Sequence, residues 1–167
     1  MLKLRPYKPA DAQMIISWCE DKDSFIKWTA GQYGKYPITP DDMNNKYAEL
    51  NRLISNGFFP MVAYDGDAPV GHIVIRYMDD SKKTVRLGFV IVDGKLRGKG
   101  YGKQLIRLAL QYAHDTLGAA KVTIGVYDNN MPAYACYISS GFHVSETTQP
   151  QIHTFSGEVW KYLELEI

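Results

Sequence analysis

The chain has 167 residues, about one domain in length, and its 46% hydrophobic and 22% charged content is ordinary for a globular protein. Its 19 Lys and Arg residues nearly balance 18 Asp and Glu residues, and a formal charge of +1 argues against nucleic acid or a membrane surface as a partner. The 2 cysteines are too few for a disulfide framework, no apolar run is long enough to span a bilayer, and no apolar leader opens the chain. A single cytoplasmic domain over residues 1–167 is expected.

The N-terminal half predicts a strand, two helices and two further strands. Residues 2–7 alternate like a strand, and residues 12–20 carry apolar side chains at helical spacing. Residues 30–42 are rich in Gly, Pro and Tyr and predict a loop, after which a capping signal begins a helix over residues 40–54. Residues 57–80 predict two strands joined by a tight turn.

The C-terminal half predicts alternating strands and helices. Residues 83–93 should form a strand whose end is apolar at successive positions, which predicts burial on both faces and a central place in the sheet. A helix should run from about Gly100 to Gly118, followed by a strand over residues 121–128 and a short helix over residues 132–140. Two strands close the chain. This order predicts a mixed α/β sheet with helices on both faces.

A glycine-rich, cationic loop lies between the central strand and its helix, with the sequence Arg97-Gly98-Lys99-Gly100-Tyr101-Gly102. Its glycines would let several backbone N–H groups approach one anion at the N-terminus of the helix. The Walker pattern fails, because Gln104 stands where Ser or Thr is required. The dinucleotide fingerprint fits poorly in spacing and position. A pyrophosphate site is the favoured interpretation, and a plain tight turn is the alternative.

A second motif follows the next strand, and together the two resemble the GNAT superfamily of N-acetyltransferases. Asn130, Ala133, Tyr137, Gly141 and Phe142 fill every fixed position of that family's N-x-x-A-x-x-x-Y-x-x-x-G-F pattern. The resemblance covers about residues 84–143. From the residues alone, the asparagine could instead cap a helix and the tyrosine could be a core aromatic.

This resemblance implies a fold and a cosubstrate. The fold would be a largely antiparallel sheet of six to seven strands with splayed central strands, and acetyl-CoA would bind in the gap. Its pantetheine arm would lie against Val90, Ile91 and Val92, and its pyrophosphate against residues 97–102. Asn130 and Ala133 would complete the cofactor site. No metal is expected.

The resemblance also implies direct transfer to a primary amine of a small molecule or peptide in a ternary complex. Tyr137 would protonate the departing thiolate as general acid. Many relatives carry a glutamate base on the central strand, but here Arg86 stands on that strand without a carboxylate. His72 is a weak candidate base, and a water chain is an alternative. Cys136 is expected to pack rather than act as a nucleophile.

The acceptor side and the assembly are less defined. Residues 24–40 should form part of the acceptor wall, with Trp28, Tyr33 and Tyr36 as candidate contacts. A homodimer is possible, since many relatives pair through terminal strands. Two other functions stay open: a non-catalytic acetyl-CoA or CoA sensor, and a phosphate-loop nucleotide binder.

Overall fold

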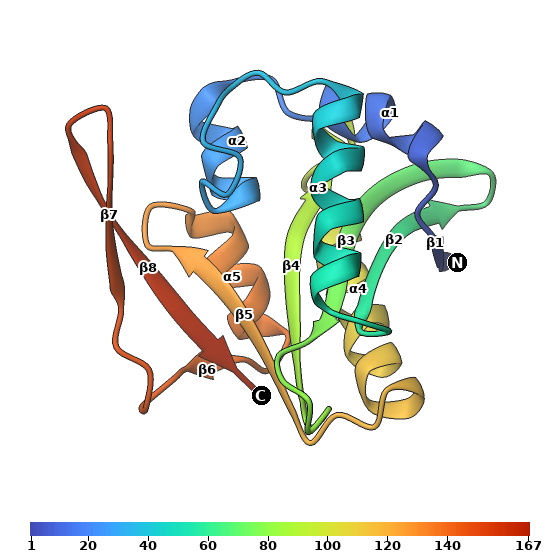
Figure 1. Ribbon diagram of the computed structural model, residues 1–167, viewed down its shortest axis with the longest axis vertical. Coiled ribbons are helices and arrows are strands. Elements are labelled where there is room, and N and C mark those ends of the chain that lie inside the picture. The colour runs from blue at the N-terminus through green and yellow to red at the C-terminus, as the bar shows by residue number, and fades with distance from the viewer.

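The computed structural model describes residues 1–167 and contains a single sheet of eight strands (Figure 1). The strands are β1 (Leu2–Pro6), β2 (Phe58–Asp65), β3 (Ala68–Tyr77), β4 (Thr84–Val92), β5 (Lys121–Tyr127), β6 (His143–Val144), β7 (Gln151–Phe155) and β8 (Glu158–Glu166). Their order is β1-β2-β3-β4-β5-β8-β6, and β7 forms a hairpin with β8. All neighbours are antiparallel except β4 and β5, which run parallel.

Helices cover both faces of this sheet. They are α1 (Ala12–Ser17), α2 (Lys22–Thr29), α3 (Pro40–Leu53), α4 (Tyr101–Gln111) and α5 (Met131–Ser139), with short turns η1 (Pro9–Asp11), η2 (Gly94–Leu96) and η3 (Tyr112–Thr116). Helix α3 begins at a reciprocal cap between Thr39 and Asp42, and α2 begins where the Asp21 side chain accepts from the Ser24 N–H at 2.8 Å. None of the helices is both long and apolar enough to cross a membrane.

The two faces bury separate apolar clusters. Helices α4 and α5 pack on the larger cluster, in which Leu105 and Ile106 meet the inward side chains of β3, β4 and β5. Helices α1, α2 and α3 pack on the smaller one, which includes Trp28, Met43 and Val74. Because successive side chains of a strand point to opposite faces of the sheet, neighbouring residues pack in opposite clusters. Both faces of the central sheet are therefore covered. The mixed α/β prediction, with helices on both faces, is confirmed.

Three details of the sequence prediction are wrong. The sheet has eight strands rather than six to seven, because β7 forms its own hairpin with β8 and the predicted strand after Gly141 shortens to β6. Three helices rather than two separate β1 from β2, because the Asp21 cap starts α2 in a segment that was not predicted to be helical. The end of β4 is not buried on both faces: Val90 and Val92 are only partly buried, since they lie beside a cavity.

The central strands separate partway along their length, as predicted. Strands β4 and β5 pair only from Thr84 opposite Lys121 to Leu87 opposite Ile124. Beyond Leu87, β4 continues to Val92 without a ladder to β5, whose other edge pairs with β8 from Thr123 to Tyr127. The divergence leaves backbone groups of β4 facing an opening instead of a neighbouring strand.

Candidate active site

A cavity of about 740 Å³ occupies the opening between the separated strands. Side chains and backbone of α2, β3, β4, β5, α4, α5 and β8 line it. All but one of the residues predicted to bind the cofactor lie in its wall: Val90, Ile91, Val92, Arg97, Gly98, Gly100, Tyr101, Gly102, Asn130, Ala133 and Tyr137. Lys99 does not line the cavity and is exposed to solvent. The fold therefore gathers two motifs that are about 30 residues apart in the chain.

A β-bulge interrupts β4 where it borders the cavity. His72 of β3 pairs with Ile91 and Val74 pairs with Gly88, so a single β3 residue faces both Phe89 and Val90. Phe89 has a φ of +48°, which is uncommon for a bulky residue and stores local strain. The bulge interrupts regular pairing with β3 at the point where pairing with β5 has already ended. Backbone donors and acceptors of β4 are thereby offered to a ligand.

The glycine loop after β4 has the geometry of an anion cradle. Gly98 has a φ of +77° and Gly100 a φ of +81°, values that only glycine adopts easily, and no other group lies within 4 Å of where a Cβ would stand. Gly100 is the N-cap of α4 and has no side chain to cap the helix. The first N–H groups of α4 are therefore free for an anion, and the helix dipole favours a negative charge there. Arg97 and Lys103 add side-chain cations.

Asn130 and α5 form the opposite wall. Asn130 is the N-cap of α5, but its side chain makes no capping hydrogen bond, so its amide is left for a ligand rather than for the helix. The capping role considered from the sequence is therefore not seen. Ala133, one turn later, presents only a methyl group to the cavity, and Gly102 of α4 lies close to α5, with Cys136 Sγ 3.6 Å from the position of a Cβ.

Tyr137 lies on α5 and reaches the cavity from within the core. Its side chain is 7% exposed and packs against Phe142, yet its hydroxyl makes no hydrogen bond to the rest of the chain. Burial raises the pKa of the Tyr137 phenol above its ordinary value, so the hydroxyl keeps its proton at every physiological pH. A protonated phenol at this position can donate a hydrogen bond or a proton into the cavity.

His72 does not occupy the position of a base. It is completely buried under α3, where Nδ1–H donates to the Met61 carbonyl at 2.8 Å and Nε2 accepts from the Tyr47 hydroxyl at 2.7 Å. Burial lowers the pKa of His72 to about 4, and its side chain does not line the cavity. The structure thus places this weak candidate in the core, as a neutral, fully hydrogen-bonded residue, and corrects the sequence-based suggestion that it could serve as the base.

Two cysteines touch the cavity without the properties of a nucleophile. Burial raises the pKa of the Cys136 thiol and raises that of Cys19 to about 11. Neither has a histidine within hydrogen-bond reach, and Cys19 Sγ donates weakly to the Asp21 carbonyl at 3.7 Å. The geometry agrees with the expectation that Cys136 packs rather than reacts.

The predicted acceptor wall is only partly formed by the expected aromatic residues. Trp28 lines the cavity from α2, whereas Tyr33 and Tyr36 do not. Tyr33 instead packs against Phe25 and Phe89, so it supports the bulged strand from behind. Lys27, one residue before Trp28, also lines the cavity and lies 5.7 Å from the Trp160 ring.

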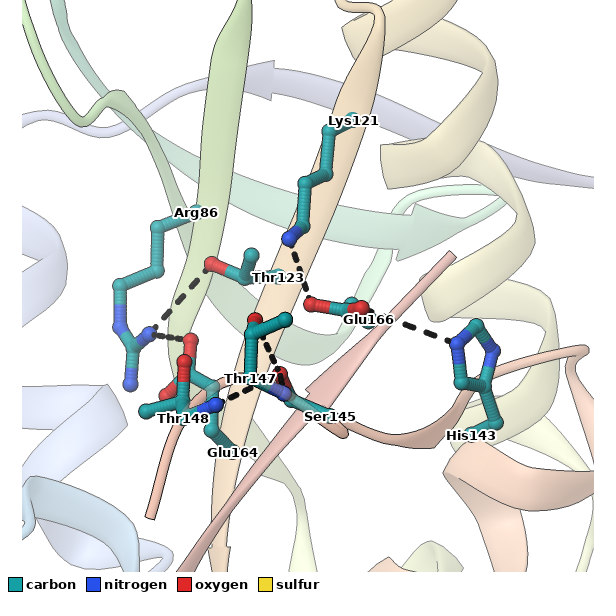
Figure 2. Close-up of polar contacts among 9 residues, drawn as sticks. All are labelled: Arg86, Lys121, Thr123, His143, Ser145, Thr147, Thr148, Glu164 and Glu166. Atoms are coloured by element: carbon teal, nitrogen blue, oxygen red, sulfur yellow. Dashed lines mark hydrogen bonds and ion pairs between the residues drawn. The ribbon is translucent and has the colours of Figure 1, made fainter.

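Arg86 and Tyr162 complete the wall, and they belong to a polar cluster across three strands that the sequence analysis did not predict. Arg86 Nη1 donates to Glu164 Oε1 on β8, and Arg86 Nη2 donates to the Tyr162 hydroxyl at 3.1 Å (Figure 2 shows Arg86 beside Glu164 and Thr123). Gly125 makes this arrangement possible, since a Cβ there would overlap the Tyr162 hydroxyl and lie 2.7 Å from Arg86 Nη2. The only signal available in the sequence was Arg86 itself, on a strand where relatives place a carboxylate.

Known proteins resemble this chain in sequence and in fold. A sequence model of the acetyltransferase (GNAT) family matches residues 22–142. Over 87 residues the chain is 30% identical to an uncharacterized N-acetyltransferase, YfmK, of Bacillus subtilis (strain 168), a match that covers 52% of this chain and 55% of that relative. The match thus extends over only about half of that relative's length.

Solved structures of N-acetyltransferases share the fold. The spermidine N-acetyltransferase of Vibrio cholerae in complex with CoA and spermine superposes with a TM-score of 0.79 at 19% identity, covering 99% of this chain and 94% of that one. A chimera of the Vibrio cholerae enzyme SpeG and hSSAT gives a TM-score of 0.80 at 18% identity, with the same coverage. At such identities the likeness is one of fold.

Proposed function

The chain belongs to the GNAT family of acetyl-CoA-dependent N-acetyltransferases, and we propose that it transfers the acetyl group of acetyl-CoA to a primary amine of a small molecule or peptide. One observation carries this proposal. The cavity between β4 and β5 joins a bulged strand edge, a glycine cradle at the start of α4 and a protonated tyrosine on α5. These three parts suit the pantetheine arm, the pyrophosphate and the sulfur of one elongated ligand.

The residues would hold acetyl-CoA mainly through the backbone. Free backbone groups of Val90 and Val92 would pair with the amides of the pantetheine arm as an added strand. The loop over residues 97–102 would bind the pyrophosphate, with Asn130 and Ala133 on the opposite side. A backbone N–H near Val92 would polarise the acetyl carbonyl as negative charge develops on its oxygen.

The reaction follows as a direct displacement. The acceptor nitrogen attacks the acetyl carbonyl carbon, a C–N bond forms, and the C–S bond of the thioester breaks. Tyr137 gives its proton to the departing thiolate, the nitrogen loses one proton to solvent, and solvent returns a proton to Tyr137 before the next turnover. The products are the N-acetyl amine and free CoA. Burial keeps the Tyr137 phenol protonated but also makes it a weaker acid, so it would first donate a hydrogen bond to the sulfur and release the proton only as negative charge develops there.

No side chain in the cavity is suited to accept the amine's proton. No aspartate, glutamate or histidine lines the cavity. The acceptor therefore reacts as the free amine, or its proton leaves through water. The dependence of kcat/KM on pH should then follow the amine's own pKa and differ between acceptors.

The testing experiment measures release of free CoA thiol from acetyl-CoA with a panel of amino acids, short peptides, polyamines and other primary amines. The proposal expects amine-dependent thiol release and an acetylated product of matching mass. Calorimetry with acetyl-CoA, CoA and ATP accompanies it. Tight binding of ATP with no binding of acetyl-CoA would overturn the proposal. Binding of acetyl-CoA with no transfer to any amine would favour the alternative of a non-catalytic sensor.

Some expectations concern the molecule as a whole. We propose one domain over residues 1–167, because all eight strands belong to one sheet. A cytoplasmic location, a homodimer and the lack of a metal stay predictions from the sequence and its family resemblance.

A further inference from the structure

The charges around the cavity are of one sign only. The cationic side chains in its wall are Lys27, Arg76, Arg86, Arg97 and Lys103, and no carboxylate lines it. Arg97 and Lys103 belong to the glycine loop and the helix that follows it. Arg86 lies on β4 about 20 Å before the end of that strand, at a rise of about 3.3 Å per residue. A second cationic region therefore exists away from the phosphate loop.

Within this second region, Arg86 already has partners. It donates to Glu164 and to the Tyr162 hydroxyl, and the Arg86 and Glu164 side chains are 14% and 16% exposed. Figure 2 shows the Arg86 guanidinium beside the Glu164 side chain. Because Glu164 neutralises Arg86, this pair adds little net charge to the cavity.

Arg76 has no such partner. It lies on β3 directly opposite Arg86 in the strand register, is half-buried, and makes neither a hydrogen bond nor an ion pair within the chain. Burial and, after it, the neighbouring Arg86 lower the pKa of Arg76, and the attraction of Tyr162 and Glu164 offsets this only in part, because Glu164 is bound to Arg86. A partly desolvated guanidinium beside a like charge is unfavourable unless an anion completes it.

We propose that Arg76 binds the carboxylate of the acceptor, and that the acceptor is an amine of the amino-acid class rather than a polyamine. This inference rests on the proposed acetyl transfer. The planar guanidinium accepts a carboxylate in a two-point contact, and the cavity contains both Arg76 and the edge of β4 where the acetyl group would lie. A polyamine would instead bring several positive charges against Lys27 and Arg76, the two cations of the wall that neither Glu164 nor the cofactor phosphates would neutralise, with no carboxylate in the wall to receive them.

The decisive experiment compares acceptors with and without the carboxylate, with every rate expressed per concentration of free amine, because conversion to the amide also lowers the pKa of the amine. Each amino acid, including those with a terminal rather than an α-amine, is assayed beside its carboxamide, with spermidine as a third arm. A charge-assisted contact predicts kcat/KM about 10- to 100-fold higher for the best acid than for its amide. The Arg76→Gln variant should reduce this ratio to within about threefold, and Arg76→Lys should keep an intermediate ratio.

Two controls separate recognition from folding. Arg107→Gln removes an exposed arginine of α4 outside the cavity and should leave the acid-to-amide ratio unchanged. Because Arg76 has no partner, Arg76→Gln should keep or raise the melting temperature, whereas Arg86→Gln leaves Glu164 unpaired and should lower it. Acetyl-CoA affinity, measured by calorimetry, should stay the same in Arg76→Gln.

The possible failures are distinguishable. Equal rates with acids and amides, a preference for spermidine, or an unchanged ratio in Arg76→Gln would each overturn this inference while leaving acetyl transfer intact. Absence of transfer to every amine would overturn the proposed function and this inference with it.

Discussion

The two ends of the cavity are built in different ways. At the proposed cofactor end, the ligand would meet mainly backbone: the bulged edge of β4, Gly98, Gly100 and the first turn of α4. At the acceptor end it would meet side chains that project from separate strands, among them Arg76 and Arg86. Backbone geometry depends on a short local sequence, whereas the acceptor end depends on which strands the fold brings together. One end can therefore stay constant while the other changes its specificity.

Tyr137 lines the cavity from α5, and its loss should have the largest effect. Tyr137→Phe removes a hydroxyl that makes no hydrogen bond within the chain, so the fold should be retained. Without a proton donor for the thiolate, kcat should fall about 100-fold or more while the Kd for acetyl-CoA changes little. Steady-state kinetics and calorimetry measure the two quantities. Tyr134→Phe, on the same helix but outside the cavity, is the matched control. Full kcat in Tyr137→Phe would remove the tyrosine from the mechanism.

A glycine at the cofactor end should affect cofactor binding alone. Gly100→Ala places a Cβ at a φ of +81°, which costs about 1–2 kcal/mol or forces the loop out of its cradle shape. We expect the Kd for acetyl-CoA to rise about tenfold and the acid-to-amide ratio to stay the same. Gly118→Ala has a similar strain, at a φ of +68°, but lies beyond the end of η3 and away from the cavity. Equal losses of affinity in both variants would show that strain alone, and not the cradle, is being measured.

Replacing a glycine at the acceptor end should impair acceptor binding and leave cofactor binding unchanged. Gly125→Ala needs no unusual φ, but its Cβ would overlap the Tyr162 hydroxyl and crowd Arg86. Tyr162 must move, at a cost of about 1–3 kcal/mol in stability, and the KM of the acceptor should rise about fivefold. The Kd for acetyl-CoA should change by less than twofold. The stability lost in the double variant Gly125→Ala with Tyr162→Leu should be less than the sum of the losses in the two single variants. Tyr162→Leu removes the hydroxyl that the new Cβ of Gly125→Ala would overlap.

The same contrast explains what the sequence could reveal. The loop over residues 97–102 and the motif from Asn130 to Phe142 are contiguous segments whose local geometry follows from their residues, so both could be singled out from the sequence as parts of one proposed cofactor site. The acceptor cluster joins Arg86 to Glu164, which are 78 positions apart, and their contact depends on β8 lying next to β5. No local sequence pattern predicts that β8 lies next to β5.

Two errors in the elements have other causes. The N-terminal signal of α2 was present in the sequence, since Asp21 precedes Ser24 at the spacing of a helix cap, but apolar periodicity over eight residues is weak. The hairpin of β7 and β8 holds a small aromatic cluster around Tyr127 and Trp160, which could be recognised only once the strands were paired. His72 is a third case, because its neutrality follows from Tyr47 and Met61, neither of which is near it in sequence.

Replacing His72 should have the smallest effect on turnover and a clear effect on acid stability. In the folded protein the pKa of His72 is lowered to about 4, against about 6.5 when unfolded, so between these values the unfolded state binds the extra proton. The contribution of His72 to stability is therefore present above pH 6.5 and lost as pH falls toward 4, by about 3 kcal/mol at most. His72→Gln, which can still hydrogen-bond Tyr47 and Met61, should flatten the fall in the free energy of unfolding over that range, as measured by urea denaturation at several pH values. Its kcat/KM profile against pH should keep the wild-type shape. A lost or shifted limb in that profile would show that His72 acts as the base for the acceptor. A residue of the core, outside the cavity wall, would then belong to the acceptor site, and the contrast between the two ends would not hold.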